Sequence, residues 1–554
     1  MIGFERADRT PTSGGEDGMA LVTVILVMLV LSSLALAALG FGLGSQNLSR
    51  RDQDWNAALA AAEAGIDDYI LRLNENGRYW QYHSGNQPPG GYQNDAFDGF
   101  VPVPGAETES EYRYTPDISR IAQDGTVRLI STGRVRDTER TVSATLRRRS
   151  FIDYLYFTDF ETLDPALYTG SPYTPAQAQT QCPKYFYAGR NANCTNISFI
   201  TRDVINGPLH TNDAMLICGN PTYNGDASTS YNGSLTGGTR WRNGSGCSSN
   251  PQWSRPGDAA LADPLTMPPS NSAIKAETAP LDGERFGGCL YTGPTRIVLN
   301  NNGTMTVTSP FSKQTNNGCP TNGTGPLPVN GVIYVQNVPS AAANPNYTNG
   351  CPYNVRFENR AGQPQRAHPL GLPIQNDQTT YGCRNGDAFV EGTLDGQLTI
   401  AAENNIVVMW NIVYKGGLAG DDLLGLVANN FVEVYHPVSC TSGTSSSCNI
   451  TPPGRSTPLR NVRIDAAILS VNHSFRVQQW GLGAPLDNLY VNGAIAQRYR
   501  GPVGTFSGTT IQSGYAKEYV YDQRLRYLEP PKFLDPVAAA WGVAVWSEVE
   551  NPQT

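Results

Sequence analysis

A long uncharged stretch near the N-terminus constrains this chain more than any other feature of its sequence. No Asp, Glu, Lys or Arg lies between Gly18 and Ser49, and most of the residues between them are apolar. About 20 apolar residues cross a bilayer as a helix, so the stretch is long enough to span a membrane. The helical pattern then continues through the AAAEAG segment at residues 60–65. This continuation is unexpected if a cleaved signal ends just before a new domain.

A cleaved secretory signal is the alternative interpretation of the N-terminus. The small residues of Ala35-Leu36-Ala37 have the spacing of a cleavage site. However, the first eighteen residues carry four acidic side chains and only two basic ones, Arg6 and Arg9. A secretory N-terminal region is positively charged and its apolar run is shorter, so the composition favours a retained helix.

The N-terminal segment resembles a prepilin, and within that class it is most similar to the PilX-type minor pilins. Their module runs Gly-x-Ala-Leu-Val, then an apolar helix, then Ala-Ala-Glu-Ala-Gly. This chain has those elements as Gly18, Ala20, Leu21, Val22 and residues 61–65, which include Glu63. The resemblance implies that a prepilin peptidase cuts between Gly18 and Met19. It also implies contact with membrane lipid and with other pilin subunits.

One position departs from the family pattern. Major pilins carry a glutamate five residues into the mature chain, where this sequence has Thr23. That glutamate is thought to pair with the N-terminus of a neighbouring subunit in the filament. Its absence implies a rare or tip subunit rather than the repeating one.

A helix over residues 19–76 is predicted from the pattern that follows the apolar stretch. One stripe of side chains recurs every three or four residues. Its members are Trp55, Leu59, Ala62, Ile66, Tyr69 and Leu73. Gly77 is a suitable helix stop. Gly40, Gly42 and Gly44 predict a kink or a melted turn, since each interior glycine costs up to ~1 kcal/mol relative to alanine.

The composition predicts a turn-rich β protein after the helix. The chain has 57 glycines and 39 prolines, and only 16% of its residues are charged. We expect a mainly β fold with a long N-terminal α-helix, in which a small α+β pilin-like head precedes a large disulfide-rich, β-helix-like domain. The expected segments are a leader at 1–18, the transmembrane and filament-core helix at 19–76, a small antiparallel sheet at 77–150, the β-helix-like domain at 151–535 and a tail at 536–554.

An internal repeat carries the prediction of a β-helix. The segment Glu403–Val407 reads ENNIV and Ala428–Val432 reads ANNFV, an offset of 25 residues. One turn of a parallel β-helix has a length in this range, with asparagines stacking at the turns. A sandwich of short strands, such as a jelly roll, remains the alternative.

The cysteines predict disulfides in an oxidising compartment. All ten lie beyond the apolar stretch and their number is even. Zinc binding is disfavoured because the sequence has no CxxC and no histidine at finger spacing. If neighbours in sequence pair, the bonds are Cys182–Cys194, Cys218–Cys247, Cys440–Cys448, Cys289–Cys319 and Cys351–Cys383.

No catalytic motif is recognisable, so we expect no enzyme activity, cofactor or metal. The five histidines are isolated, and neither a Walker A loop nor a G-x-S-x-G elbow occurs. Asp421 and Asp422 could bind a cation, although a solvated turn is the simpler interpretation. Trp241, Trp253 and Tyr291 could line a carbohydrate groove if they are exposed. The net charge of −8 and the lack of a basic patch give no reason to expect nucleic-acid binding.

These observations predict a minor pilin or pseudopilin of a type IV filament system. The protein would be a single-pass membrane protein before assembly and part of a cell-surface filament afterwards. A tip position would present the large β domain for adhesion or assembly, and a surface or carbohydrate is a possible ligand. The alternative is a membrane-anchored extracytoplasmic protein that binds glycans or acts on polysaccharides.

Overall fold

The computed structural model describes residues 17–550 of the chain with several gaps. The longest gap covers residues 350–381. The shorter gaps are residues 77–78, 90–92, 107–109, 122–125, 149, 279, 282–284, 317, 383, 439–442, 453–454, 508–509, 527 and 537–540. The chain forms two compact units, one within residues 1–117, 128–145 and 546–554 and the other within residues 118–127 and 146–545.

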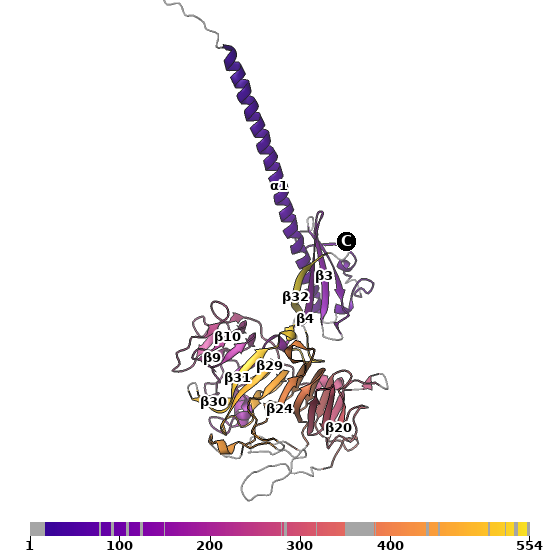
Figure 1. Cartoon of the computed structure of the whole chain (residues 1–554), viewed down its shortest axis with the longest axis vertical. Helices are drawn as coiled ribbons and strands as arrows, with labels where there is room; N and C mark the ends of the chain where they lie inside the picture. The colour runs from indigo at the N-terminus through magenta and orange to yellow at the C-terminus, as the bar shows by residue number, and fades with distance from the viewer. Residues whose placement is uncertain are drawn as a thin grey trace, which may run out of the picture. The chain divides into compact units, whose positions relative to one another are not determined.

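The first unit consists of a helix and a five-stranded sheet (Figure 1). Helix α1 runs from Asp17 to Glu75 without a break. The kink predicted at Gly40, Gly42 and Gly44 is therefore wrong. Each backbone carbonyl in a continuous helix keeps its hydrogen bond, which offsets the small cost of each glycine.

The strands of the first unit lie in the order β1-β2-β3-β4-β32. They are β1 (Val101–Pro102), β2 (Glu111–Asp117), β3 (Val127–Val135), β4 (Thr138–Arg148) and β32 (Trp541–Val549). Strands β1, β2 and β3 pair antiparallel, with Tyr112 opposite Gly133. The segment 536–554, expected as a tail, thus contains a strand of this sheet. The large unit is inserted in the chain between two neighbouring strands.

The second unit is built mainly from parallel strands in a network of 22 (Figure 1). These strands are β5 (Tyr156–Leu163), β7 (Val204–Asn206), β8 (Leu209–Thr211), β10 (Thr222–Tyr223), β11 (Ala227–Thr229), β13 (Gln252–Trp253), β14 (Ala260–Leu261), β17 (Cys289–Thr292), β18 (Thr295–Asn300), β19 (Thr304–Thr308), β20 (Asn322–Pro326), β21 (Val332–Gln336), β22 (Ala388–Leu394), β23 (Gln397–Ala402), β24 (Ile406–Tyr414), β25 (Leu423–Ala428), β26 (Val432–Val434), β27 (Arg463–Ser470), β28 (Phe475–Val477), β29 (Pro485–Arg500), β30 (Gly504–Ser507) and β31 (Thr510–Tyr521).

Smaller elements complete the second unit. A three-stranded parallel sheet contains β6 (Phe199–Ile200), β9 (Met215–Cys218) and β12 (Trp241–Asn243). Strands β15 (Pro280–Leu281) and β16 (Arg285–Phe286) pair antiparallel. The short helices are α3 (Pro175–Gln181) and α4 (Ser272–Ala276).

Two parallel ladders follow the order of the sequence through the second unit. One ladder joins β17, β21, β23, β25, β27 and β29, and the other joins β18, β22, β24, β26 and β28. The pairing stacks Ile400, Leu426, Ile468 and Ile495, all of which are fully buried. Because equivalent positions stack directly, one apolar row continues from strand to strand.

The predicted repeat is present, but its register differs by one residue. Asn404 contacts Asn430, 26 residues later, through a side-chain hydrogen bond, and the amide of Phe431 donates to Asn405 Oδ1 at 3.1 Å. Ile406 pairs with Val432 in the ladder. The offset of 25 from the sequence is therefore wrong. Burial of the strand side chains sets the register, rather than the best match of the asparagine letters.

Three of the five predicted disulfides are present. They are Cys182–Cys194, Cys218–Cys247 and Cys289–Cys319. Cys351, Cys383 and Cys440 lie outside the described residues, so the other two pairs stay predictions. Cys448, the expected partner of Cys440, is buried.

Asp387 is a fully buried carboxylate at one end of the asparagine stack. Its Oδ1 accepts hydrogen bonds from Asn404 Nδ2 at 2.6 Å and from the Asn405 amide at 3.0 Å. Its Oδ2 has no partner among the residues that the structure describes. Burial, helped by the negative charge of Glu433, raises the pKa of Asp387 to about 7.

The raised pKa predicts that stability falls as pH rises. Between about pH 4, where an unfolded Asp ionises, and about pH 7, the folded chain binds the additional proton. Asp387→Asn keeps the Oδ1 acceptor and removes the charge. We expect the variant to be more stable than wild type at pH 8 by on the order of 2 kcal/mol, with a flatter stability curve from pH 4 to 7.

Chemical denaturation of the full chain in detergent at several pH values measures this difference. Asp421→Asn, at an exposed carboxylate, is the matched control and is expected to follow wild type. Parallel curves for wild type and Asp387→Asn would show that Asp387 does not govern the pH dependence.

Candidate functional site: the N-terminal helix and its sheet

The first half of α1 has apolar side chains on all its faces. Residues Leu21–Gly40 have a mean hydropathy of 2.7, and none of this segment is buried in the structure. Leu21, Val22 and Thr23 are all exposed. The Gly18–Met19 bond, where cleavage is predicted, belongs to the first turn of the helix. By length and composition the segment could cross a bilayer.

The second half of α1 packs on the sheet through a face that carries small side chains at its start and large ones at its end. The buried face contains Ala58, Ala61, Ala62, Gly65, Ile66, Tyr69 and Leu73. Four members of the predicted stripe are on this face. Trp55 is 52% exposed and Leu59 is half-buried, so the sheet covers only the C-terminal part of the predicted stripe. Glu63 is exposed and lies outside the buried face.

Two glycines let the helix approach the sheet closely. A Cβ atom on Gly133 of β3 would lie 2.1 Å from the Ala58 carbonyl oxygen and 2.3 Å from the Ala62 nitrogen. A Cβ atom on Gly65 would lie 2.4 Å from Ser131 Oγ. All three distances are far inside van der Waals contact. Only glycine fits at position 133, where the neighbouring atoms are backbone, and a side chain at position 65 would displace the Ser131 hydroxyl.

Polar groups bind the helix to the sheet at the same contact. Ser131 Oγ donates to the Ala62 carbonyl at 2.7 Å. Further along the helix, the Tyr114 hydroxyl donates to Asp68 Oδ2 at 2.6 Å, and Arg72 donates to the same oxygen at 2.8 Å. The Ser131 and Tyr114 bonds fix the rotation of the helix about its axis, because each joins a defined helical position to a defined strand position, whereas the Arg72 bond lies within the helix and orients Asp68.

Aromatic rings surround this polar contact. Tyr69 lies edge-on to Tyr79, Phe97 and Tyr114, with ring centroids 5.3–6.3 Å apart. Burial raises the pKa of Tyr112 to about 12, and burial followed by the negative charge of Asp68 raises the pKa of Tyr114 further. The hydroxyl of Tyr114 therefore stays a hydrogen-bond donor at any physiological pH.

An arginine side chain pairs with the last strand of the sheet, which is also hydrogen-bonded to β4. Arg140 of β4 donates to both carboxylate oxygens of Glu548 at 2.6 Å, and its guanidinium lies 4.6 Å from the Trp55 ring centroid. A bidentate pair of this kind has a defined geometry. Trp55, a member of the predicted stripe, thus contacts the arginine that pairs with β32.

Gly133, Ser131, Asp68 and Arg140 were not identified from the sequence. A signal for part of this contact was present, because Ala58, Ala61, Ala62 and Gly65 are small residues at helical spacing. Nothing in the sequence indicates which glycine of the sheet faces them.

Buried charges in the second unit pair with one another. Arg500 and Glu161, each 1% exposed at the side chain, lie 3.0 Å apart, and Lys517 lies 3.2 Å from Asp203. Burial raises the pKa of Glu161 and lowers that of Lys517. Because each charge has an opposite partner, this cluster is explained by structure alone.

Other candidate positions from the sequence also have structural roles. Asp422 accepts the amides of Gly396 at 2.7 Å and Gly416 at 2.8 Å, which uses both of its carboxylate oxygens in a turn. Tyr291 is fully buried, and Trp253 stacks on Tyr223 with centroids 4.5 Å apart. Among the described residues, no group of three or more His, Cys, Asp or Glu side chains could hold a metal ion.

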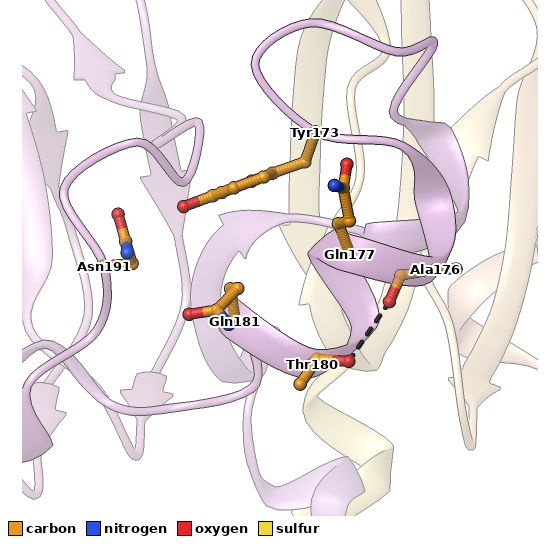
Figure 2. A pocket seen from close by; sticks show the side chains of 6 residues that line it. All are labelled: Tyr173, Ala176, Gln177, Thr180, Gln181 and Asn191. Atoms are coloured by element: carbon orange, nitrogen blue, oxygen red, sulfur yellow. Dashed lines mark hydrogen bonds between the residues drawn. The ribbon is translucent and has the colours of Figure 1, made fainter.

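A polar depression lies on the second unit (Figure 2). Its volume is about 580 Å³, and it is lined by Tyr173, Ala176, Gln177, Thr180, Gln181 and Asn191. The structure brings together here residues that the sequence did not single out.

Comparisons with known proteins identify no family. No protein-family model matches the chain, and no curated protein matches it. A solved structure of the competence-associated pilin ComZ from Thermus thermophilus aligns with 90% of this chain and 97% of its own, at 12% identity and a TM-score of 0.25. A score this low carries no argument about fold or function.

The close approach at Gly133 predicts a large effect of one methyl group. Gly133→Ala would press Cβ into the helix backbone, which cannot move aside as a side chain can. We expect the first unit to lose about 3 kcal/mol of stability and the amides of residues 58–73 to exchange faster with solvent. Hydrogen exchange of the full chain in detergent measures both effects.

Gly99→Ala is the matched control, because a Cβ atom there meets nothing within 4 Å. Equal exchange in Gly133→Ala, Gly99→Ala and wild type would contradict the proposed contact.

Proposed function

We propose that the chain is a pilin-like subunit, a minor pilin or pseudopilin of the PilX type in a type IV filament system. The observation that carries the proposal is α1 itself. One 59-residue helix is exposed and apolar at its start and packed on an antiparallel sheet at its end. An anchor alone needs only about 20 residues. The remaining helix supports a second role, in which the rod leaves the bilayer and packs among other subunits.

Thr23 supports a minor role within the filament. A threonine hydroxyl is neutral, so it cannot form an ion pair with the N-terminus of a neighbouring subunit. The large second unit supports a terminal position, because repeated lateral packing leaves little room for nearly four hundred inserted residues. We propose that this unit is a β-helix-like coil, supported by its sequential parallel ladders, and that it acts in adhesion or assembly rather than as an enzyme.

Processing between Gly18 and Met19 is the first test. Peptidases of this class need a small residue at the cut, so Gly18→Phe is expected to abolish maturation. Mass spectrometry of the protein from its native host is expected to find Met19 at the N-terminus, with methylation. Gly15→Phe, at a leader glycine away from the cut, is the control and is expected to mature normally.

Two results would refute the proposal. One is a mature N-terminus after Ala37, which would mean that the apolar rod is removed during export. The other is maturation of Gly18→Phe at the rate of wild type.

The second candidate function is an anchored extracytoplasmic protein that binds glycans or acts on polysaccharides. The polar depression at Tyr173 favours the binding form of this alternative, because it offers amides and a phenol to a ligand. Cell fractionation separates the two candidates. A pilin-like subunit is expected in sheared filaments, whereas an anchored protein stays with the membrane.

A further inference from the structure

The polar depression lies on a small lobe of the second unit, residues 168–194, which a disulfide cross-links. Helix α3 is tied to the following loop by the Cys182–Cys194 disulfide. A small core of Tyr168, Ala178, Cys182 and Cys194 lies beneath, and Tyr173 packs against it. The Thr174 hydroxyl caps the helix by accepting a hydrogen bond from the backbone amide of Gln177 at 3.3 Å. The side chains above this base are therefore displayed on a rigid support.

Three segments of the lobe contribute to the depression (Figure 2). Tyr173 precedes the helix, Gln177 and Gln181 lie one turn apart on it, and Asn191 comes from the loop inside the disulfide. The Tyr173 phenol points across the depression toward Asn191. The helical lining residues and Asn191 are exposed, so the site opens to solvent.

Part of the lining is already used in local hydrogen bonds. Gln177 Oε1 accepts from the Thr174 amide at 2.9 Å, and Asn191 Oδ1 accepts from the Asn193 amide at 3.0 Å. Thr180 Oγ1 donates to the Ala176 carbonyl at 3.2 Å. These bonds orient the two amide groups and leave their NH₂ donors available.

Other polar groups of the lining have no partner in the described part of the chain. These are the Gln177 and Asn191 NH₂ groups, the whole amide of Gln181 and the hydroxyl of Tyr173. Together they offer several donors and at least two acceptors beside one aromatic ring.

The chemistry of the lining selects among ligand classes. No Lys, Arg, His, Asp or Glu lines the depression, so it offers no charge to an ion. An apolar ligand would cover amides without satisfying them, which is unfavourable. A neutral sugar fits better, because its hydroxyls both donate and accept and its C–H face can lie on a tyrosine ring. The volume of about 580 Å³ falls in the range of small-molecule sites.

We infer that this depression binds a neutral saccharide, with the amides of Gln177, Gln181 and Asn191 on its hydroxyls and Tyr173 against its ring. The inference rests on the proposed function in one respect, since it supplies the ligand class that a surface-displayed unit would recognise. Binding itself needs no filament, so the two ideas can fail separately.

The test uses the oxidised full chain in a zwitterionic detergent, which carries no sugar headgroup. The probes are an array of neutral oligosaccharides and a matched array of uronic-acid and sialylated ones, followed by titration of each hit. We expect neutral saccharides to bind and Gln181→Ala to weaken them by about three- to tenfold, as for one or two lost hydrogen bonds. Tyr173→Leu is expected to weaken them at least as much.

Gln179→Ala is the matched control, because it removes an exposed amide from the same helix outside the lining. It is expected to bind like wild type. If Gln181→Ala is unfolded, Gln181→Glu replaces it, since the new charge alters the site at constant size and is expected to weaken binding.

Several results would overturn the inference. They are no binding of any neutral saccharide, binding of acidic saccharides only, or affinities that both Gln181 variants and Tyr173→Leu leave unchanged. Processing at Gly18 and recovery in sheared filaments report on the proposed function, and neither depends on this depression.

Discussion

The first unit depends on a contact between two backbones. Gly133 lies directly beneath Ala58 and Ala62, so the helix rests on the strand with no side chain between them. Such proximity gives many dispersion contacts and leaves no room for a methyl group. It also places Ser131 at the Ala62 carbonyl and Tyr114 at Asp68. The rotation of the helix on the sheet is therefore defined.

The second unit is stabilised on a different principle. Its parallel ladders stack equivalent residues, so apolar rows such as Ile400, Leu426 and Ile468 extend through the core. Asparagines stack in the same way at the turns. Their side-chain amides form hydrogen bonds with one another and with backbone groups that have no ladder partner there. Asp387 ends this stack, and its Oδ2 has no hydrogen-bond partner in the part of the chain that the structure describes.

Features set by local composition could be predicted from the sequence. The apolar stretch, the even cysteine number and the β-rich body follow from residue types alone, and three disulfides joined cysteines adjacent in sequence as expected. Features that depend on which strands and side chains pair in the fold could not be predicted from the sequence. The helical period placed Trp55 and Tyr69 on one stripe, but it does not say that the sheet covers only the C-terminal part of that stripe. The repeat was misaligned by one residue, because register depends on burial across strands.

The depression at Tyr173 was missed for the same reason. Its amides are separated in sequence and have no motif, and only the fold of the disulfide loop brings Asn191 to the helix.

The place of β32 in the sheet has a consequence for biosynthesis. Strand β4 ends at Arg148, and its neighbour β32 begins at Trp541, roughly four hundred residues later. At about 5–20 residues per second, the ribosome needs roughly 20–80 s to supply the missing strand. During that interval β4 is an edge strand with one unpaired side. The exposed backbone groups of an unpaired edge can associate with other chains. The nascent sheet therefore needs either a chaperone that covers this edge or rapid pairing with β32. The length of the inserted unit determines how long the edge stays unpaired.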